Sequence, residues 1–122
     1  MILADTGIWI DHFRKPEPEL QRYLAQTSIT MHPFIVAELA LGSLRDRIRT
    51  LATLERIPQV QVAQLGEVRR MIEAHSLYNS GIGLTDVHLL ASTLITPFTR
   101  LWTRDKRLRR VAESMGISVN HP

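Results

Sequence analysis

The chain of 122 residues contains no cysteine. Disulfide bridges and zinc sites built from thiolates are therefore excluded, and the composition suits a reducing compartment. The sequence also lacks an apolar run long enough to cross a bilayer, and Asp5 and Asp11 interrupt the stretch where a secretory signal would need its hydrophobic core. We therefore expect a soluble, cytoplasmic protein.

Internal repeats, low-complexity tracts and linkers rich in glycine or serine are equally absent. The length suits one domain, and a hydrophobic fraction of 44% with a charged fraction of 22% is typical of a globular chain with its own core. We therefore expect residues 1–122 to form a single domain.

The chain has little net charge, only +3, but its positive excess is concentrated in one segment. Residues 100–110 hold six basic side chains and one acidic one, Asp105, whereas the rest of the chain has a slight excess of acids. Such a segment can bind a polyanion, or it can simply be a solvated helix face. The basic residues that we expect to contact phosphates are Arg100, Arg104, Lys106 and Arg107.

Short apolar or β-branched runs alternate with helical patterns along the chain. The expected strands are residues 2–5, "SITMH", "VQVA", "TRLWT" and "ISV". The expected helices follow Asp5, begin near Pro16, and cover "PFIVAELALGSL", "RIRTLATLERI", residues 65–75, "LTDVHLLASTLI" and "DKRLRRVAESM". This alternation predicts an α/β fold, with a parallel sheet covered by helices on both faces.

Four acidic side chains stand in apolar surroundings. Asp5 ends the first expected strand and Asp105 follows "TRLWT", so both should lie at the carboxyl edge of the sheet, where parallel sheets place their sites. Glu38 is the only charge in "PFIVAELALG", a helix apolar nearly all round and therefore expected to be largely buried. Asp86 is the only acid in "GIGLTDVHLLASTLI".

Each of these acids has a purely structural alternative. Asp5, Asp86 and Asp105 could cap the turn or helix beside them, which is worth about 1 kcal/mol. Glu38 lies too far inside its helix to cap it, so a buried salt bridge is its main alternative.

Four carboxylates gathered at one edge would repel one another and destabilise the fold. A hard divalent cation removes that cost, and magnesium or manganese prefers oxygen ligands. Thr6 and Thr103 add hydroxyls beside two of the acids, where they can orient a carboxylate or a water. With such an ion in place, an activated water could attack a phosphodiester, and a second ion could stabilise the leaving oxygen.

Four sequence blocks carry a family likeness. "ILADTGIWIDHFR", "IVAELALG", "GIGLTDVHLLAS" and "LWTRDKRLRRVA", in this order, resemble the PIN-domain ribonucleases, and specifically the VapC-type toxins of toxin–antitoxin pairs. The resemblance implies a three-layer α/β/α sandwich with a central parallel sheet of four or five strands. It also implies a magnesium- or manganese-dependent endoribonuclease that is inhibited by a small VapB-type antitoxin and usually forms a homodimer.

The resemblance also assigns the site residues. Asp5 and Asp86 match the family's surest magnesium ligands, while Glu38 and Asp105 match acids that bind through water, position the nucleophile or hold a second ion. The chain departs from the family at Gly7, where many members have serine. This departure concerns a hydroxyl contact and leaves the carboxylate set intact.

Two other functions fit parts of the sequence. A phosphatase of the haloacid-dehalogenase kind would use Asp5 as nucleophile, but its usual second aspartate would fall at Gly7. A nucleic-acid- or protein-binding module could retain the fold without catalysis, although no acid of the set is missing. The five histidines include no close ligand pair, which disfavours zinc.

The helices near the N-terminus predict a surface for a partner. "GIWIDHF" and "ELQRYL" together carry more apolar side chains than one buried face requires, which favours an exposed hydrophobic patch. The antitoxin or a second copy of the chain could cover it. Trp9 and Trp102 are expected in the core, and Asp11 is expected to pair with Arg14 or Lys15.

Overall fold

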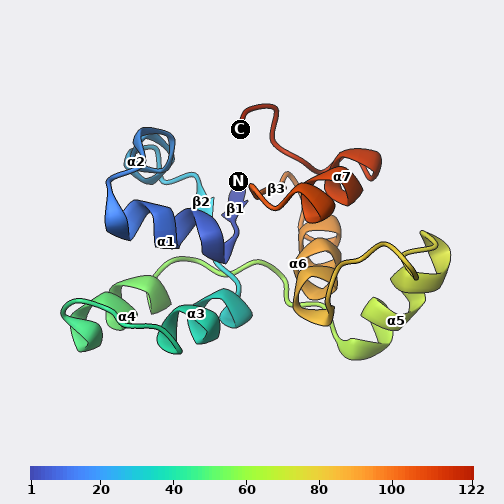
Figure 1. Cartoon of the computed structure of the whole chain (residues 1–122), viewed down its shortest axis with the longest axis horizontal. Helices are drawn as coiled ribbons and strands as arrows, with labels where there is room; N and C mark the ends of the chain where they lie inside the picture. Colours follow the sequence, from blue (N-terminus) through green and yellow to red (C-terminus); the bar gives the residue numbers. More distant parts are fainter.

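Three short parallel strands form the centre of the computed structural model, which describes all residues 1–122 (Figure 1). They are β1 (Ile2–Ala4), β2 (Ile29–Thr30) and β3 (Arg100–Trp102), in the order β2-β1-β3. Ile2 pairs with Ile29 on one side and with Arg100 on the other. The prediction of a parallel sheet is confirmed, but the predicted count of four or five strands is wrong.

The two missing strands are reduced to single bridges at the edges of the sheet. Gln59 bridges Met31 just before "VQVA", and Ser118 of "ISV" bridges Leu101. After the bridge at Gln59, the backbone of "VQVA" pairs with side chains in and just after the helix of residues 84–95. The backbone N–H of Gln61 donates to Thr96 Oγ1 (2.9 Å), and that of Ala63 donates to Ser92 Oγ (3.0 Å). These side chains satisfy donors that a strand would have paired with its neighbour.

Seven helices surround the strands and confirm the predicted helical segments. They are α1 (Thr6–Arg14), α2 (Pro18–Ala25), α3 (Pro33–Ala40), α4 (Arg47–Glu55), α5 (Leu65–Ala74), α6 (Leu84–Ile95) and α7 (Lys106–Ser114). In Figure 1, α1 and α2 lie on the side of β2, and α6 and α7 lie on the side of β3, so helices flank the strands on both sides, in agreement with the predicted α/β fold class. None of the helices is both long and apolar enough to cross a membrane.

One cluster of 25 buried apolar residues links the layers. Leu3 and Ala4 of β1 are completely buried because helices cover both faces of the sheet. Trp9 and Trp102 belong to the same cluster, as predicted.

Helix α3 corrects one expectation. Only Ile35 and Leu39 of this apolar helix are buried, and Glu38 is exposed and forms no salt bridge. The helix packs one face against the core and α1, and its other face borders solvent. An apolar composition all round therefore does not make this helix a buried one.

Candidate functional site

Asp5 lies where β1 ends, and three groups hold it there. Its backbone N–H donates to Trp102 O of β3 (2.8 Å). Its carboxylate accepts hydrogen bonds from the backbone N–H of Thr6 (2.7 Å) and from Thr103 Oγ1 (2.8 Å). Asp5 therefore caps helix α1 and presents its carboxylate at the carboxyl edge of the sheet.

Thr103 ties Asp105 to the same edge. The Thr103 hydroxyl, on a residue only 2% exposed, also accepts a hydrogen bond from the backbone N–H of Asp105 (3.1 Å). Asp105 Oδ1 in turn accepts from the backbone N–H of Leu108 (3.0 Å) and so caps α7. Asp105 therefore does cap a helix, which was the structural alternative for this residue. It also lies two residues after Thr103, which donates to Asp5, so it is close to the Asp5 carboxylate as well.

Glu38 and Asp86 reach this edge from two further helices. Thr6 Oγ1 donates to Glu38 Oε1 (2.8 Å), which connects α3 to the first turn of α1. Asp86 stands in the first turn of α6, where the helix dipole favours a negative charge. Four chain segments far apart in the sequence thus deliver one carboxylate each.

The four carboxylates interact electrostatically. Burial, and after it the charges of Asp5, Asp105 and Glu38, raise the pKa of Asp86 to about 6. Burial also raises the pKa of Asp5 above its usual value, although the hydrogen bonds from Thr103 and Thr6 oppose this effect. Mutual repulsion of this kind is typical of acids that share one site.

His32 fixes the two helices that carry Glu38 and Asp86 relative to one another. It is completely buried; Nδ1 accepts from the backbone N–H of Phe34 (3.0 Å) and Nε2 contacts Ser92 Oγ of α6 (3.1 Å). Burial, together with the nearby His88, lowers the pKa of His32 to about 4, so the ring is neutral at pH 7. The sequence offered no sign of this role, because it depends on a contact sixty residues along the chain.

The basic segment divides into two groups. Arg100 lies at the amino end of β3, opposite Ile2, and donates to the carbonyl oxygens of Gly116 and Ser118. It therefore lies at the opposite end of the strands from Asp5, and its predicted contact with an RNA phosphate would be made away from the carboxylates. Lys106 and Arg107 stand in the first turn of α7, directly after Asp105.

Arg104 is already paired. Its guanidinium donates to Asp11 Oδ2 (3.0 Å) and to Glu17 Oε2 (2.7 Å), and it lies 5.6 Å from the ring of Trp102. The expected pairing of Asp11 with Arg14 or Lys15 is therefore wrong, because a residue 93 positions away takes its place. The two acids compete with a phosphate for Arg104.

The chemistry of the donor set suits a hard divalent cation. All four side chains supply carboxylate oxygens, and an ion would offset both the burial and the mutual repulsion that raise the pKa values of Asp5 and Asp86. In the present side-chain conformations, no group of three or more histidine, cysteine, aspartate or glutamate residues is close enough together to hold a metal ion. Coordination would require the carboxylates to move closer to one another than they are at present.

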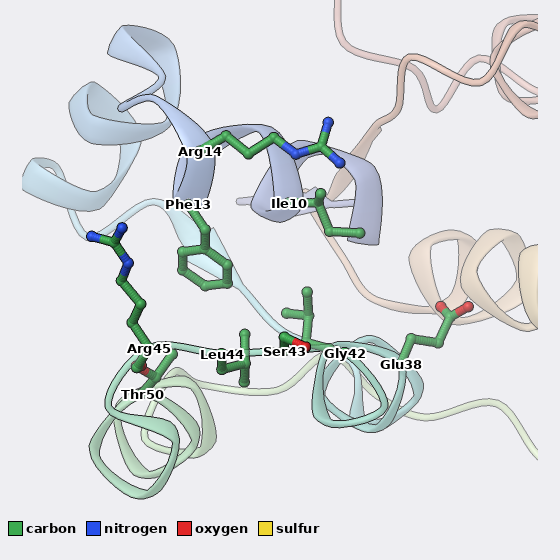
Figure 2. Close-up of a pocket in the computed structure, with 10 residues that line it drawn as sticks. Ile10, Phe13, Arg14, Glu38, Gly42, Ser43, Leu44, Arg45 and Thr50 are labelled. Atoms are coloured by element: carbon green, nitrogen blue, oxygen red, sulfur yellow. The ribbon is translucent and has the colours of Figure 1, made fainter.

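A groove of about 640 Å³ runs beside the carboxylates, between α1 and the segment that joins α3 to α4 (Figure 2). Ile10 and Phe13 point into it from α1, and Leu44 lies opposite them. Glu38 stands at the end of the groove nearest α6, so the groove leads toward the acids. Of the two helices for which an apolar patch was predicted, α1 lines this groove with Ile10 and Phe13, and α2 contributes no residue to it.

Comparison with known proteins supports the family resemblance of the sequence blocks, and the similarity extends along nearly the whole chain. The model of the family described as "PIN domain" matches residues 2–114. Two relatives named Ribonuclease VapC32, from Mycobacterium tuberculosis strains CDC 1551 / Oshkosh and ATCC 25618 / H37Rv, are each 37% identical over 119 residues. The alignment covers 98% of this chain and 96% of each relative.

Proposed function

The chain belongs to the PIN-domain family, among its VapC-type ribonucleases, and from this membership we propose that it is the toxin of a toxin–antitoxin pair. Its activity would be that of an endoribonuclease that hydrolyses RNA phosphodiester bonds, and its single domain would span residues 1–122. The observation that carries the proposal is the meeting of Asp5, Glu38, Asp86 and Asp105 within electrostatic reach at one edge of the sheet.

The proposed cofactor is magnesium, with manganese as a substitute. Asp5 and Asp86 would hold the ion, and Glu38 and Asp105 would bind it through water or hold a second ion. When bound, such an ion supplies charge stabilisation and an acidified water for attack on phosphorus.

The protein's own residues would orient the carboxylates and neutralise the charge of the RNA backbone. Thr103 fixes the direction of the Asp5 carboxylate, and Thr6 does the same for Glu38. Lys106 and Arg107, beside Asp105, would contact the RNA backbone. Arg104 would contribute only if a phosphate displaced it from Asp11 and Glu17.

Incubation of the purified protein with RNA, in magnesium, manganese or EDTA, tests this function. We expect cleavage with either metal, none in EDTA, and a loss of about 100-fold or more in Asp5→Asn. Asp46→Asn is the matched control, since Asp46 is exposed, caps nothing through its side chain, and has the left-handed backbone that asparagine also tolerates. Cleavage that persists in EDTA would refute the metal mechanism, and binding without cleavage would indicate a silent module.

The groove of Figure 2 supports the second part of the proposal, a VapB-type antitoxin as partner. Ile10 and Phe13 are 40% and 41% exposed there, which favours burial under an apolar peptide segment. Phe13→Asp should prevent capture of the cognate antitoxin and leave RNA cleavage intact, whereas Phe98→Asp, an exposed site on the turn before β3, should change neither. If the groove instead serves a homodimer, Phe13→Asp will lower the mass of the free protein in light scattering.

A further inference from the structure

The loop that joins α5 to α6 forms a second hollow beside the carboxylates. This loop covers residues 75–83 and is the yellow segment between the two helices in Figure 1. With the first turns of α6 it borders an open hollow of about 260 Å³. The apolar lining residues are Ile72, Leu77, Tyr78, Ile82, Leu84 and Val87.

The hollow and the candidate site share one helical turn. Gly83, Leu84 and Val87 line the hollow, and Asp86 lies between the last two. Asp86 itself does not line the hollow, but the first turn of α6 carries Asp86 and the lining residue Leu84, so the two lie within one helical turn, about 5 Å along the axis.

Arg107 adds a cation to the same loop. Its side chain lies across Gly81, where a Cβ atom would approach Arg107 Cδ to 3.1 Å, and its Nη1 is 3.5 Å from the Gly81 carbonyl oxygen. Gly81 has φ +83°, a conformation that strains any other residue, so the loop is shaped to admit this arginine. A phosphate near Asp105 would thus meet the guanidinium at the border of the hollow.

Tyr78 supplies an aromatic surface with no partner in the protein. It is 60% exposed, takes part in no hydrogen bond, and is not among the aromatic pairs, although it lines the hollow. Exposed aromatic rings beside a cationic groove are the usual platform for an unpaired base, since single-stranded RNA is bound by stacking. A cavity of roughly 150 Å³ accepts one benzene ring, so this hollow has room for a base.

On the basis of the proposed nuclease function, we infer that this hollow holds one unpaired base of the RNA substrate, stacked on Tyr78, while Arg107 contacts the adjoining phosphate. The hollow would then place the neighbouring phosphodiester at the carboxylates. Since stacking tolerates every base, the contact selects for single-stranded RNA and favours purines over pyrimidines.

Binding of fluorescein-labelled eight-nucleotide probes to the non-cleaving Asp5→Asn protein tests the inference. The probes are oligoadenylate, oligouridylate and an abasic ribose-phosphate chain of equal length, in magnesium. We expect the order oligoadenylate, oligouridylate, abasic chain, with about 5- to 100-fold between the first and last. Adding Tyr78→Ala should remove most of this difference, whereas Tyr78→Phe should retain it.

Phe98→Ala, added to the same protein, is the matched control. Phe98 is 94% exposed and lies on the turn before β3, away from the carboxylates, so its loss should leave the probe order unchanged. A base preference that survives Tyr78→Ala, or equal affinity of the parent protein for abasic and adenylate chains, would overturn the inference. Either result leaves the proposed function standing if the wild-type protein still cleaves RNA with magnesium; failure of that cleavage would refute the function itself.

Discussion

At the scale of single residues, Asp86 is the carboxylate most disturbed by its neighbours. Its pKa in the folded protein is about 6, above the ordinary value of 3.8, so the folded state holds the proton more tightly than the unfolded state does. The contribution of Asp86 to the stability of the metal-free protein should therefore be greatest below the ordinary pKa and should be lost as the pH rises through about 6. Near neutral pH the ionised Asp86 weakens the fold.

Asp86→Asn should accordingly stabilise the metal-free protein. We expect the free energy of unfolding at pH 8 to rise by up to about 1 kcal/mol, a figure discounted because Asp86 is only half-buried and solvent screens its charge. Urea unfolding in EDTA at pH 8 and pH 5 measures this, and the gain should shrink at the lower pH. A loss of stability at pH 8 would mean that the ionised side chain forms a net stabilising bond.

Thr103 is the residue through which two of the acids are connected. Thr103→Val keeps the shape and removes the hydroxyl that donates to Asp5 and accepts from the backbone of Asp105. Because the site is buried, we expect the free energy of unfolding to fall by about 1–2 kcal/mol. Thr53→Val, an exposed threonine bonded only to Arg49 O within its own helix, is the control and should be nearly neutral. Equal effects of the two substitutions would remove Thr103 from its positioning role.

At the scale of secondary-structure elements, substitutions of Asp105 distinguish its role as the cap of α7 from its proposed role in catalysis. Asp105 caps this helix through Leu108, and asparagine caps as well as aspartate does, whereas alanine does not. Asp105→Ala should therefore cost about 1 kcal/mol in unfolding experiments, and Asp105→Asn should cost little. If the charge serves catalysis, both variants should lose RNA cleavage. An active Asp105→Asn protein would reduce Asp105 to a helix cap.

Helices were more predictable than strands in this chain. The pattern "LTDVHLLASTLI" coincides with α6 because caps and apolar spacing act locally along the sequence. "VQVA" and "ISV" have strand composition, yet the first has a single bridge just before it, at Gln59, and the second makes one bridge, at Ser118. The conformation of "VQVA" depends on distant groups: Thr96, just after α6, binds the backbone N–H of Gln61, and Ser92 of α6 binds that of Ala63. Composition within a segment does not specify such partners.

At the scale of the whole molecule, the sequence predicted the carboxylates better than it predicted the cations. Strand order and direction place the ends of β1 and β3 together, so Asp5 and Asp105 follow from the pattern of the chain. Arg100 belongs to the same basic segment, but it stands five residues before Asp105, at the other end of β3. Arg104 is at the correct end, but Asp11 and Glu17 from the first helices pair with it. These pairings require coordinates.

The mutual repulsion of the acids predicts that divalent ions stabilise the whole fold. An ion at 100 times its dissociation constant adds about 2.7 kcal/mol, which for a chain of this length corresponds to a rise of roughly 10 °C in Tm. Thermal unfolding in magnesium, manganese and EDTA measures the rise. The combined Asp5→Asn and Asp86→Asn variant should not respond to either metal, because it lacks both proposed ligands, while Asp46→Asn should respond like wild type. A double variant that magnesium stabilises as strongly as the wild type would place the ion elsewhere on the molecule.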